Sequence, residues 1–346
     1  MKKDQDVYLV WLNWPERCFR ADSGDIAYLK SMVPKGSRVV RATSERAFLR
    51  ELPKATHAIT WDFKKEWFAR APRLRLLATP AAGREFVPTE GPKGVKIHFG
   101  GFHGKIMAES VAAFVLAWAR GMFRPELREK AWPRNELSGV CYEVAGTRAV
   151  IAGYGRVGRA IGAKLEALGV SVAGITRHGV FAGGKKLAKP QLERLLKSAD
   201  WFVMALPSTT GTDDFLSASM MAKLPRRCVV VNVGRGNAID ERALYRALKS
   251  HRLAGACLDV RRHEPSATVL ETPGYVPELA DLPNCVVTPH TSAFSPRYLR
   301  RCFDELRDEG LLDPPPLRNH PKIWYNTLIS KKGVQRLWQQ EILKIA

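Results

Sequence analysis

The feature that most constrains this 346-residue chain is a G-x-G-x-x-G sequence formed by Gly153, Gly155 and Gly158. An apolar run, Arg148–Ala152, precedes it, and residues 156–168 carry apolar side chains at helical spacing. In such a unit the first glycine permits a tight turn, the second lets the backbone approach a pyrophosphate, and the third lets the helix pack on the strand. The helix start offers free N–H groups to phosphates. The unit predicts dinucleotide binding, and the alternative is a purely structural glycine-rich turn.

Apolar strands and amphipathic helices continue to alternate after this unit. The further strands are predicted at residues 170–175, 201–205, 228–232, 253–260 and 285–288. Continuous apolar strands separated by helices are typical of a parallel sheet covered on both faces. Six strands in this order favour a doubly wound fold.

The first hundred residues repeat the theme in shorter units, with strands predicted at residues 7–12, 38–41, 57–60, 74–78 and 95–99 and a helix at 44–52. A long helix over 107–122 is expected to lead into the second domain. The chain turns helical again after His290, and we expect this tail to cross back to the first domain. The fold class is therefore α/β, with a doubly wound dinucleotide-binding domain (105–291) and a smaller, flavodoxin-like substrate domain (1–104, completed by 292–346).

Charge is the unusual feature of the composition, with 55 Lys and Arg against 34 Asp and Glu and a formal net charge of +21. The basic residues are spread along the chain, and no nucleic-acid motif is present. We therefore expect a generally basic surface that favours anionic small ligands, and no nucleic-acid partner.

The compartment is inferred from hydrophobic runs and cysteines. No run of about 18 uncharged apolar residues occurs, so no membrane span is expected, and residues 7–12 suit a buried strand better than a signal sequence. The six cysteines are scattered without a C-x-x-C motif. We expect a reducing, cytoplasmic location and no structural metal.

Cofactor choice depends on the residues that end the second strand of the dinucleotide unit. NAD enzymes place Asp or Glu there to hold the ribose 2′-hydroxyl. Here the place holds Thr176 and Arg177, and no acidic residue occurs between Glu166 and Glu193. An arginine grips a 2′-phosphate that a carboxylate would repel. We predict NADP(H) in preference to NAD(H), and the alternative is that Arg177 is only a solvated surface residue.

Three polar side chains follow later predicted strands at their carboxyl ends, where ligands bind in open α/β sheets. Arg235 supplies a cation for a substrate carboxylate, His290 a proton donor for a developing alkoxide, and Glu264 a carboxylate that keeps the donor protonated near neutral pH. Each alone has a structural alternative. Together they predict hydride transfer to or from a carbonyl.

With these motifs in place, the chain resembles the D-isomer-specific 2-hydroxyacid dehydrogenases, over about residues 74–333 and most strongly over 144–292. The matching segments are Met107-Ala108-Glu109-Ser110, the Gly153 loop, Ala205-Leu206-Pro207-Ser208-Thr209, Val231-Asn232-Val233-Gly234-Arg235-Gly236, Leu253-Ala254-Gly255-Ala256, Leu258-Asp259-Val260 and Thr288-Pro289-His290.

The resemblance implies a role for each matching residue. Arg235 would bind the substrate carboxylate and carbonyl, His290 would be the general acid for reduction and base for oxidation, and Glu264 would raise its pKa. Ala82 and Gly83 would offer backbone N–H groups to the substrate carboxylate. Asp259 would face the nicotinamide carboxamide. The full set of expected cofactor contacts is Gly153, Tyr154, Gly155, Arg156, Val157, Gly158, Thr176, Arg177, Leu206, Pro207, Thr212, Val233, Asp259 and Ser292.

Two departures from the family pattern lie near the site. Arg261 and Arg262 replace the usual aromatic after Leu258-Asp259-Val260, and the segment 269–277 looks longer than usual. The first 70 residues match only in pattern, so the substrate stays open. The leading expectation is a reductase of glyoxylate or hydroxypyruvate, and the alternatives are a phosphoglycerate-type dehydrogenase and a non-catalytic, cofactor-sensing corepressor-like protein.

The resemblance also implies a homodimer. Its interface is expected to include residues 107–132, because this segment carries more aromatic surface than one helix face needs. The aromatics concerned are Phe114, Trp118, Phe123 and Trp132.

Overall fold

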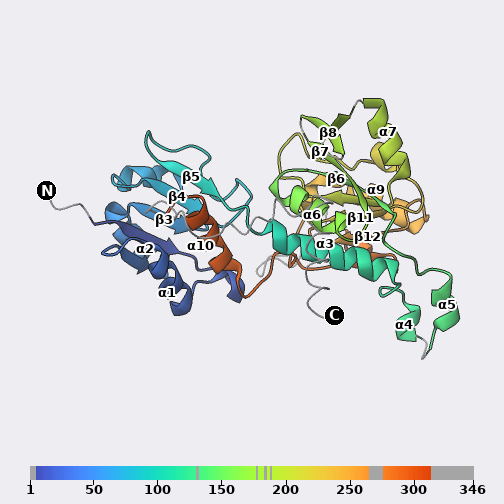
Figure 1. The fold of residues 1–346 in the computed structure, drawn as a ribbon, viewed down its shortest axis with the longest axis horizontal. Helices are drawn as coiled ribbons and strands as arrows, with labels where there is room; N and C mark the ends of the chain where they lie inside the picture. Colours follow the sequence, from blue (N-terminus) through green and yellow to red (C-terminus); the bar gives the residue numbers. More distant parts are fainter. Residues whose placement is uncertain are drawn as a thin grey trace, which may run out of the picture.

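The computed structural model describes residues 5–129, 132–176, 178–182, 185–187, 189–264 and 276–312. Its strands form two separate sheets, drawn at the left and right of Figure 1. No helix among the described residues is both long enough and apolar enough to span a membrane.

The first sheet is wholly parallel, with strand order 2-1-3-4-5, as expected for a flavodoxin-like unit. Across the sheet the strands are β2 (Arg38–Arg41), β1 (Val7–Trp11), β3 (His57–Thr60), β4 (Leu76–Thr79) and β5 (Lys96–Phe99). Helices α1 (Ser23–Met32), α2 (Glu45–Glu51) and α10 (Tyr298–Asp308) accompany this sheet (Figure 1).

Alternate residues of β1 feed two cores, because successive side chains of a strand point to opposite faces. Tyr8 and Val10 pack in one core with Phe303 of α10, and Leu9 packs in the other with Phe48 of α2. The Tyr8 hydroxyl also donates to the Leu312 carbonyl at 2.8 Å. Helix α10 therefore packs on the first sheet although it follows the last strand of the second.

The second sheet contains eight strands, of which six are parallel and in doubly wound order. Across the sheet the strands are β13 (Cys285–Val287), β12 (Gly255–Leu258), β11 (Val229–Asn232), β10 (Trp201–Met204), β6 (Arg148–Ala152), β7 (Ser171–Thr176), β8 (Gly179–Ala182) and β9 (Lys185–Leu187). The α/β fold class with two parallel-sheet units is thus confirmed.

The antiparallel strands β8 and β9 are a departure from the predicted all-parallel sheet. Strand β8 returns along β7, pairing Thr176 with Gly179, and β9 pairs with β8. The hairpin extends the sheet beyond β7, the strand whose end is predicted to select the cofactor.

Helices cover both faces of the second sheet. They are α3 (Gly104–Ala119), α6 (Arg156–Glu166), α7 (Lys189–Ser198), α8 (Ala218–Met221) and α9 (Glu241–Lys249). On one face Val111 and Val115 of α3 pack with Val231, whereas Val230 packs with Leu244 of α9 on the other. The Trp118 ring lies so close to β12 that a Cβ on Gly255 would be 1.8 Å from it.

The short helices α4 (Glu126–Glu129) and α5 (Arg134–Ser138) project away from the second sheet beyond the end of α3 (Figure 1). The predicted domain limits at 104/105 and 291/292 stay predictions. Residues 313–346 of the expected closing segment and the long loop at 269–277, apart from 276 and 277, lie outside the described residues.

Candidate functional site

The glycine-rich loop lies where the strand order reverses, between β6 and β10. Gly153 has a φ of +90°, and a Cβ there would come within 2.5 Å of the Ala205 carbonyl oxygen. A Cβ on Gly158 would lie 2.3 Å from the Gly153 carbonyl oxygen, whereas one on Gly155 would meet nothing within 4 Å. Gly153 therefore permits the tight turn, and Gly158 permits close packing of the helix on the loop. Gly155 leaves open space in which a ligand can approach the backbone.

Helix α6 begins directly after this open position. Its N-cap residue, Gly155, makes no side-chain cap, so the first-turn N–H groups at Arg156, Val157 and Gly158 have neither an intrahelical nor a capping partner. Such a helix start attracts phosphate through its N–H groups and its dipole. The loop therefore fits the pyrophosphate of a dinucleotide.

Tyr154 of the glycine-rich loop packs against the second sheet. Its N–H donates to the Ile175 carbonyl at 2.9 Å. Its side chain packs so closely on α6 and β7 that a Cβ on Gly162 would lie 2.7 Å from the hydroxyl oxygen and one on Gly174 would lie 2.1 Å from a ring carbon. Tyr154 therefore fixes the loop against the sheet. Its contact with a cofactor stays a prediction.

The end of β7 carries the predicted cofactor selector. The Thr176 hydroxyl donates to the Gly179 carbonyl at 3.1 Å and accepts from the His178 N–H at 3.1 Å, which ties the strand end to the β8 hairpin. Arg177 lies outside the described residues. Preference for NADP(H) stays a prediction.

The loops after β10 and β11 are packed together. The Thr212 hydroxyl donates to the Pro207 carbonyl at 2.7 Å and closes the first of these loops. A Cβ on Gly234 would lie 2.6 Å from the Leu206 nitrogen, so the second loop passes directly over the first. The loop after β10, which is expected to contact the adenine side of the cofactor, and the loop after β11, which carries Arg235, thus hold each other in position.

Asn232, which the sequence analysis did not single out, shapes the turn that presents Arg235. Its side chain is fully buried, accepts from the Gly234 N–H at 3.0 Å and donates to the Arg235 carbonyl at 3.1 Å. Val233, predicted to contact cofactor, is 1% exposed, and its N–H donates to the Met204 carbonyl. The position of Val233 in the sequence motif was visible, but the structural role of its neighbour Asn232 was not.

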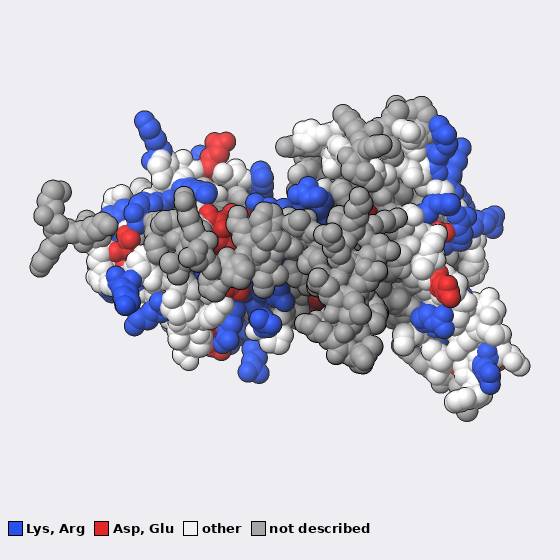
Figure 2. All heavy atoms as spheres, viewed as in Figure 1, with Lys and Arg blue, Asp and Glu red and all other residues white. Residues whose placement is uncertain are grey.

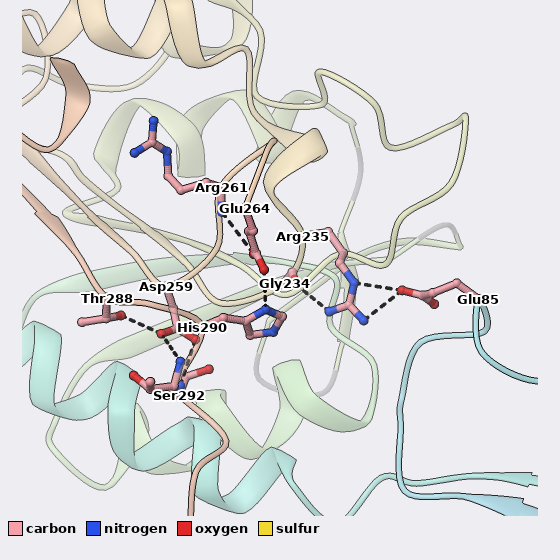
Figure 3. A network of polar contacts seen from close by, with 10 residues as sticks. Glu85, Gly234, Arg235, Asp259, Arg261, Glu264, Thr288, His290 and Ser292 are labelled. Carbon is pink, nitrogen blue, oxygen red and sulfur yellow. Dashed lines mark hydrogen bonds and ion pairs between the residues drawn. The ribbon is translucent and has the colours of Figure 1, made fainter. Parts of the chain in front are cut away.

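His290 and Glu264 lie in contact, with 2.8 Å between Nδ1 and Oε2 (Figure 3). The hydrogen bond that His290 donates to the Glu264 carboxylate raises the pKa of His290 above its ordinary value, although burial opposes the shift. Because Nδ1 faces the carboxylate, Nε2 is the ring nitrogen available to a substrate. His290 has a φ of +54°, a left-handed conformation that its loop must sustain.

Asp259 sustains that loop. Its Oδ1 accepts from the Thr288 hydroxyl at 2.6 Å and the Thr291 N–H at 2.9 Å, and its Oδ2 accepts from the Ser292 N–H at 2.9 Å. The Asp259 carbonyl accepts from the His290 N–H. The residue is 1% exposed, so its carboxylate acts within the protein as the anchor of the histidine loop. The expected contacts of Asp259 and Ser292 with cofactor stay predictions.

The arginines that replace the usual aromatic have a clear structural place. The guanidinium of Arg261 donates to both carboxylate oxygens of Glu241 at 3.0 and 3.1 Å, and both side chains are 4% exposed. The Arg262 N–H donates to Glu241 at 2.7 Å, and the Arg261 N–H donates to Glu264 at 3.4 Å. This buried pair therefore holds the segment that positions Glu264.

The same segment packs on the Arg235 turn, since a Cβ on Gly236 would lie 1.8 Å from the Arg261 carbonyl carbon. Arg235, Glu264 and His290 consequently lie together on loops braced by buried contacts (Figure 3). Their catalytic roles stay predictions, and the arrangement suits proton transfer beside an anion-binding cation.

The expected substrate loop approaches from the first sheet. Gly83 is buried, Ala82 is exposed, and both follow β4. Two residues further on, Glu85 accepts from Arg235 Nε at 3.1 Å and from Nη2 at 3.0 Å. Sequence reasoning missed Glu85, whose position beside Ala82 and Gly83 was the available signal.

The family model described as "D-isomer specific 2-hydroxyacid dehydrogenase, NAD binding domain" matches residues 112–292. The chain belongs to the D-isomer-specific 2-hydroxyacid dehydrogenase family. The residues that match the family model thus include every loop of the second sheet described above.

Curated members of this dehydrogenase family include several that are similar to the chain. D-3-phosphoglycerate dehydrogenase 1 of Saccharomyces cerevisiae is 32% identical over 195 residues, which are 54% of this chain and 41% of the yeast protein. Glycerate dehydrogenase of Methylorubrum extorquens is 29% identical over 248 residues, 68% of this chain and 75% of that protein. The match to the yeast dehydrogenase thus spans less than half of its length.

Among solved dehydrogenase structures, an NADPH-dependent glyoxylate/hydroxypyruvate reductase from Sinorhizobium meliloti, in complex with NADP and sulfate, has a TM-score of 0.66 and 25% identity. The comparison covers 88% of this chain and 96% of that one. The likeness therefore extends over both sheets.

Proposed function

We propose that this protein transfers hydride between NADP(H), or NAD(H), and a small 2-oxo or D-2-hydroxy acid such as glyoxylate or hydroxypyruvate. The observation that supports it best is the contact of His290 with Glu264 beside Arg235. Family membership and the match to glycerate dehydrogenase point the same way.

In the reduction, each residue of the site has a separate role. Arg235 binds the substrate carboxylate, with backbone N–H groups of Ala82 and Gly83 opposite. His290 gives the proton on Nε2 to the carbonyl oxygen, and Glu264 stabilises the imidazolium before transfer. The nicotinamide, when bound, supplies the hydride to the carbonyl carbon. In oxidation neutral His290 takes the hydroxyl proton instead.

The preference for NADP(H) rests on the sequence at the end of β7, which lacks an acidic residue. The Sinorhizobium reductase, whose structure contains NADP, supports this proposal. The basic surface also favours anionic ligands, since blue side chains are scattered over both halves of the face drawn in Figure 2.

A phosphoglycerate-type dehydrogenase is the second candidate, favoured by the 32% identity to the yeast enzyme. Both candidates are tested by following NADPH and NADH oxidation with a panel of 2-oxo acids that includes glyoxylate, hydroxypyruvate and phosphohydroxypyruvate. Turnover of the unphosphorylated acids supports the leading proposal. Tight cofactor binding with no turnover across the panel would instead support a cofactor-sensing role.

We also propose a homodimer in a reducing, cytoplasmic setting. All six cysteines are free. Trp132 and Met122, in and near the α4–α5 projection, are 83% and 66% exposed. Phe114 and Trp118, however, pack in the subunit's own core. Fewer aromatic side chains are therefore available to an interface than the sequence indicated. The proposed interface therefore rests on Met122 and Trp132.

A further inference from the structure

The substrate-binding arginine already holds a carboxylate. Arg235 Nε and Nη2 both donate to Oε1 of Glu85, at 3.1 and 3.0 Å (Figure 3). The two residues come from different sheets, since Glu85 follows β4 and Arg235 follows β11. Two charge-assisted donors on one carboxylate oxygen are the kind of contact that a substrate carboxylate would make.

The Glu85 carboxylate also lies over the opposite wall of the site. A Cβ placed on Gly83 would be 2.2 Å from Glu85 Oε2 and 2.6 Å from Arg235 Nη2. Gly83 and Arg235, which are in contact here, are the groups to which the proposed function assigns the carboxylate of the substrate. Glu85 and the substrate therefore need the same cation and the same space.

The backbone on the carboxyl side of Glu85 is fixed, whereas its side chain borders solvent. The Phe63 N–H donates to the Phe86 carbonyl at 3.1 Å, and Val87 is 4% exposed. The Glu85 side chain is 43% exposed. Its release from Arg235 consequently needs only rotation of the side chain into water, without unfolding of the loop.

We propose that Glu85 is an internal competitor for the substrate carboxylate and sets the affinity of the site for anions. The inference rests on the proposed function. A ligand that offers Arg235 only a weak contact does not displace Glu85, whereas a 2-oxo acid adds the contact of its carbonyl with His290. Because Glu85 has left Arg235 once substrate is bound, the competition raises KM and leaves kcat unchanged.

The decisive experiment is titration calorimetry with oxalate, an unreactive dicarboxylate, on the wild type and Glu85→Gln, each saturated with NADPH. We expect Glu85→Gln to bind oxalate about fivefold more tightly, which corresponds to about 1 kcal/mol and suits a partly exposed ion pair. Glu90→Gln is the matched control, because it removes the same charge from an exposed position in the same segment and should bind as the wild type does. Arg235→Gln should abolish binding in both backgrounds.

Equal or weaker oxalate affinity in Glu85→Gln, or binding by neither protein, would overturn the proposal. Steady-state assays with glyoxylate give the second measurement, with KM expected to fall about fivefold at unchanged kcat. The two proposals fail separately. Turnover by the wild type with identical oxalate affinities removes only the role of Glu85, whereas tighter oxalate binding without turnover of any 2-oxo acid removes only the proposed reaction.

Discussion

His290 and Glu264, separated by 26 positions in the sequence, meet through Nδ1 and Oε2 at 2.8 Å. The histidine is held by Asp259 from one side, and the glutamate by the buried Arg261–Glu241 pair from the other. Their contact is thus the meeting point of two separately braced loops, and it raises the pKa of His290.

This contact predicts a specific pH response. Glu264→Gln keeps the side-chain shape but removes the charge that favours the imidazolium, so the pKa of His290 should fall. Reduction needs the protonated ring, so its alkaline limit should move to lower pH. Oxidation needs the neutral ring, so its acid limit should also move to lower pH. Profiles of kcat/KM against pH for both directions give the measurement, and a profile that overlays the wild type would refute the pair.

His290→Gln tests the proton transfer itself. The rate kcat should fall by about 10²–10⁴, because a positioned acid or base contributes that much, while the Kd for cofactor stays nearly unchanged. Single-turnover kinetics and fluorescence titration with NADPH measure the two quantities. A purely structural histidine would instead lower the Tm and leave the pH profile of the remaining activity unaltered.

Cofactor preference is predicted to depend on Arg177. The kcat/KM should be higher with NADPH than with NADH, and Arg177→Ala should narrow the difference by about ten- to a hundredfold, as expected for loss of a charge-assisted phosphate contact. Lys164→Ala, which removes an exposed charge of α6, serves as the control. An enzyme that prefers NADH and does not respond to Arg177→Ala would contradict this prediction.

The buried pair of Arg261 and Glu241 should show strong energetic coupling. Glu241→Gln leaves a buried guanidinium without its counter-charge and should lower the free energy of unfolding by about 3–5 kcal/mol. The double variant Glu241→Met/Arg261→Met should recover part of that loss, because neither charge remains. Urea unfolding of the wild type, Glu241→Met, Arg261→Met and the double variant measures the coupling. Losses that simply add would show that the pair does not act as a unit.

The proposed dimer predicts that Trp132→Asp combined with Met122→Asp releases monomers. A charge at these exposed apolar positions should oppose association without disturbing the core. Light scattering at micromolar concentration provides the mass, and Arg242→Asp on an exposed site of α9 is the control. A wild type that already scatters as a 38.7 kDa particle would count against the dimer.

The sequence predicted the parts of the fold that depend on local patterns. Gly153, Gly155 and Gly158 each meet a different steric requirement of a strand–turn–helix unit, and the structure contains the strand, the turn and the helix. The β8–β9 hairpin escaped prediction because its strands are only four and three residues long, and two of the three residues of β9 are lysines. Gly183-Gly184 between them was a hairpin signal in the sequence.

The candidate site was predicted only where single residues carry recognisable chemistry. Arg235, Glu264 and His290 do so. The partners that hold them do not, because pairing of Glu241 with Arg261, or of Glu85 with Arg235, is decided by the packing of distant strands. The replacement of an aromatic by Arg261 was visible in the sequence, but its compensating carboxylate was not.

The distribution of these groups between the two sheets has a kinetic consequence. The glycine loop, Arg235, Glu264 and His290 all belong to loops of the eight-stranded sheet, whereas Gly83 and Glu85 come from the five-stranded sheet and close the site at Arg235. Under the proposed function, the cofactor surface and the proton donor are therefore complete before the substrate arrives. We expect ordered addition, with the dinucleotide first and the acid second, so that the hydroxy acid leaves before the spent dinucleotide. The oxidised dinucleotide should then inhibit competitively against its reduced form, and the hydroxy acid should not.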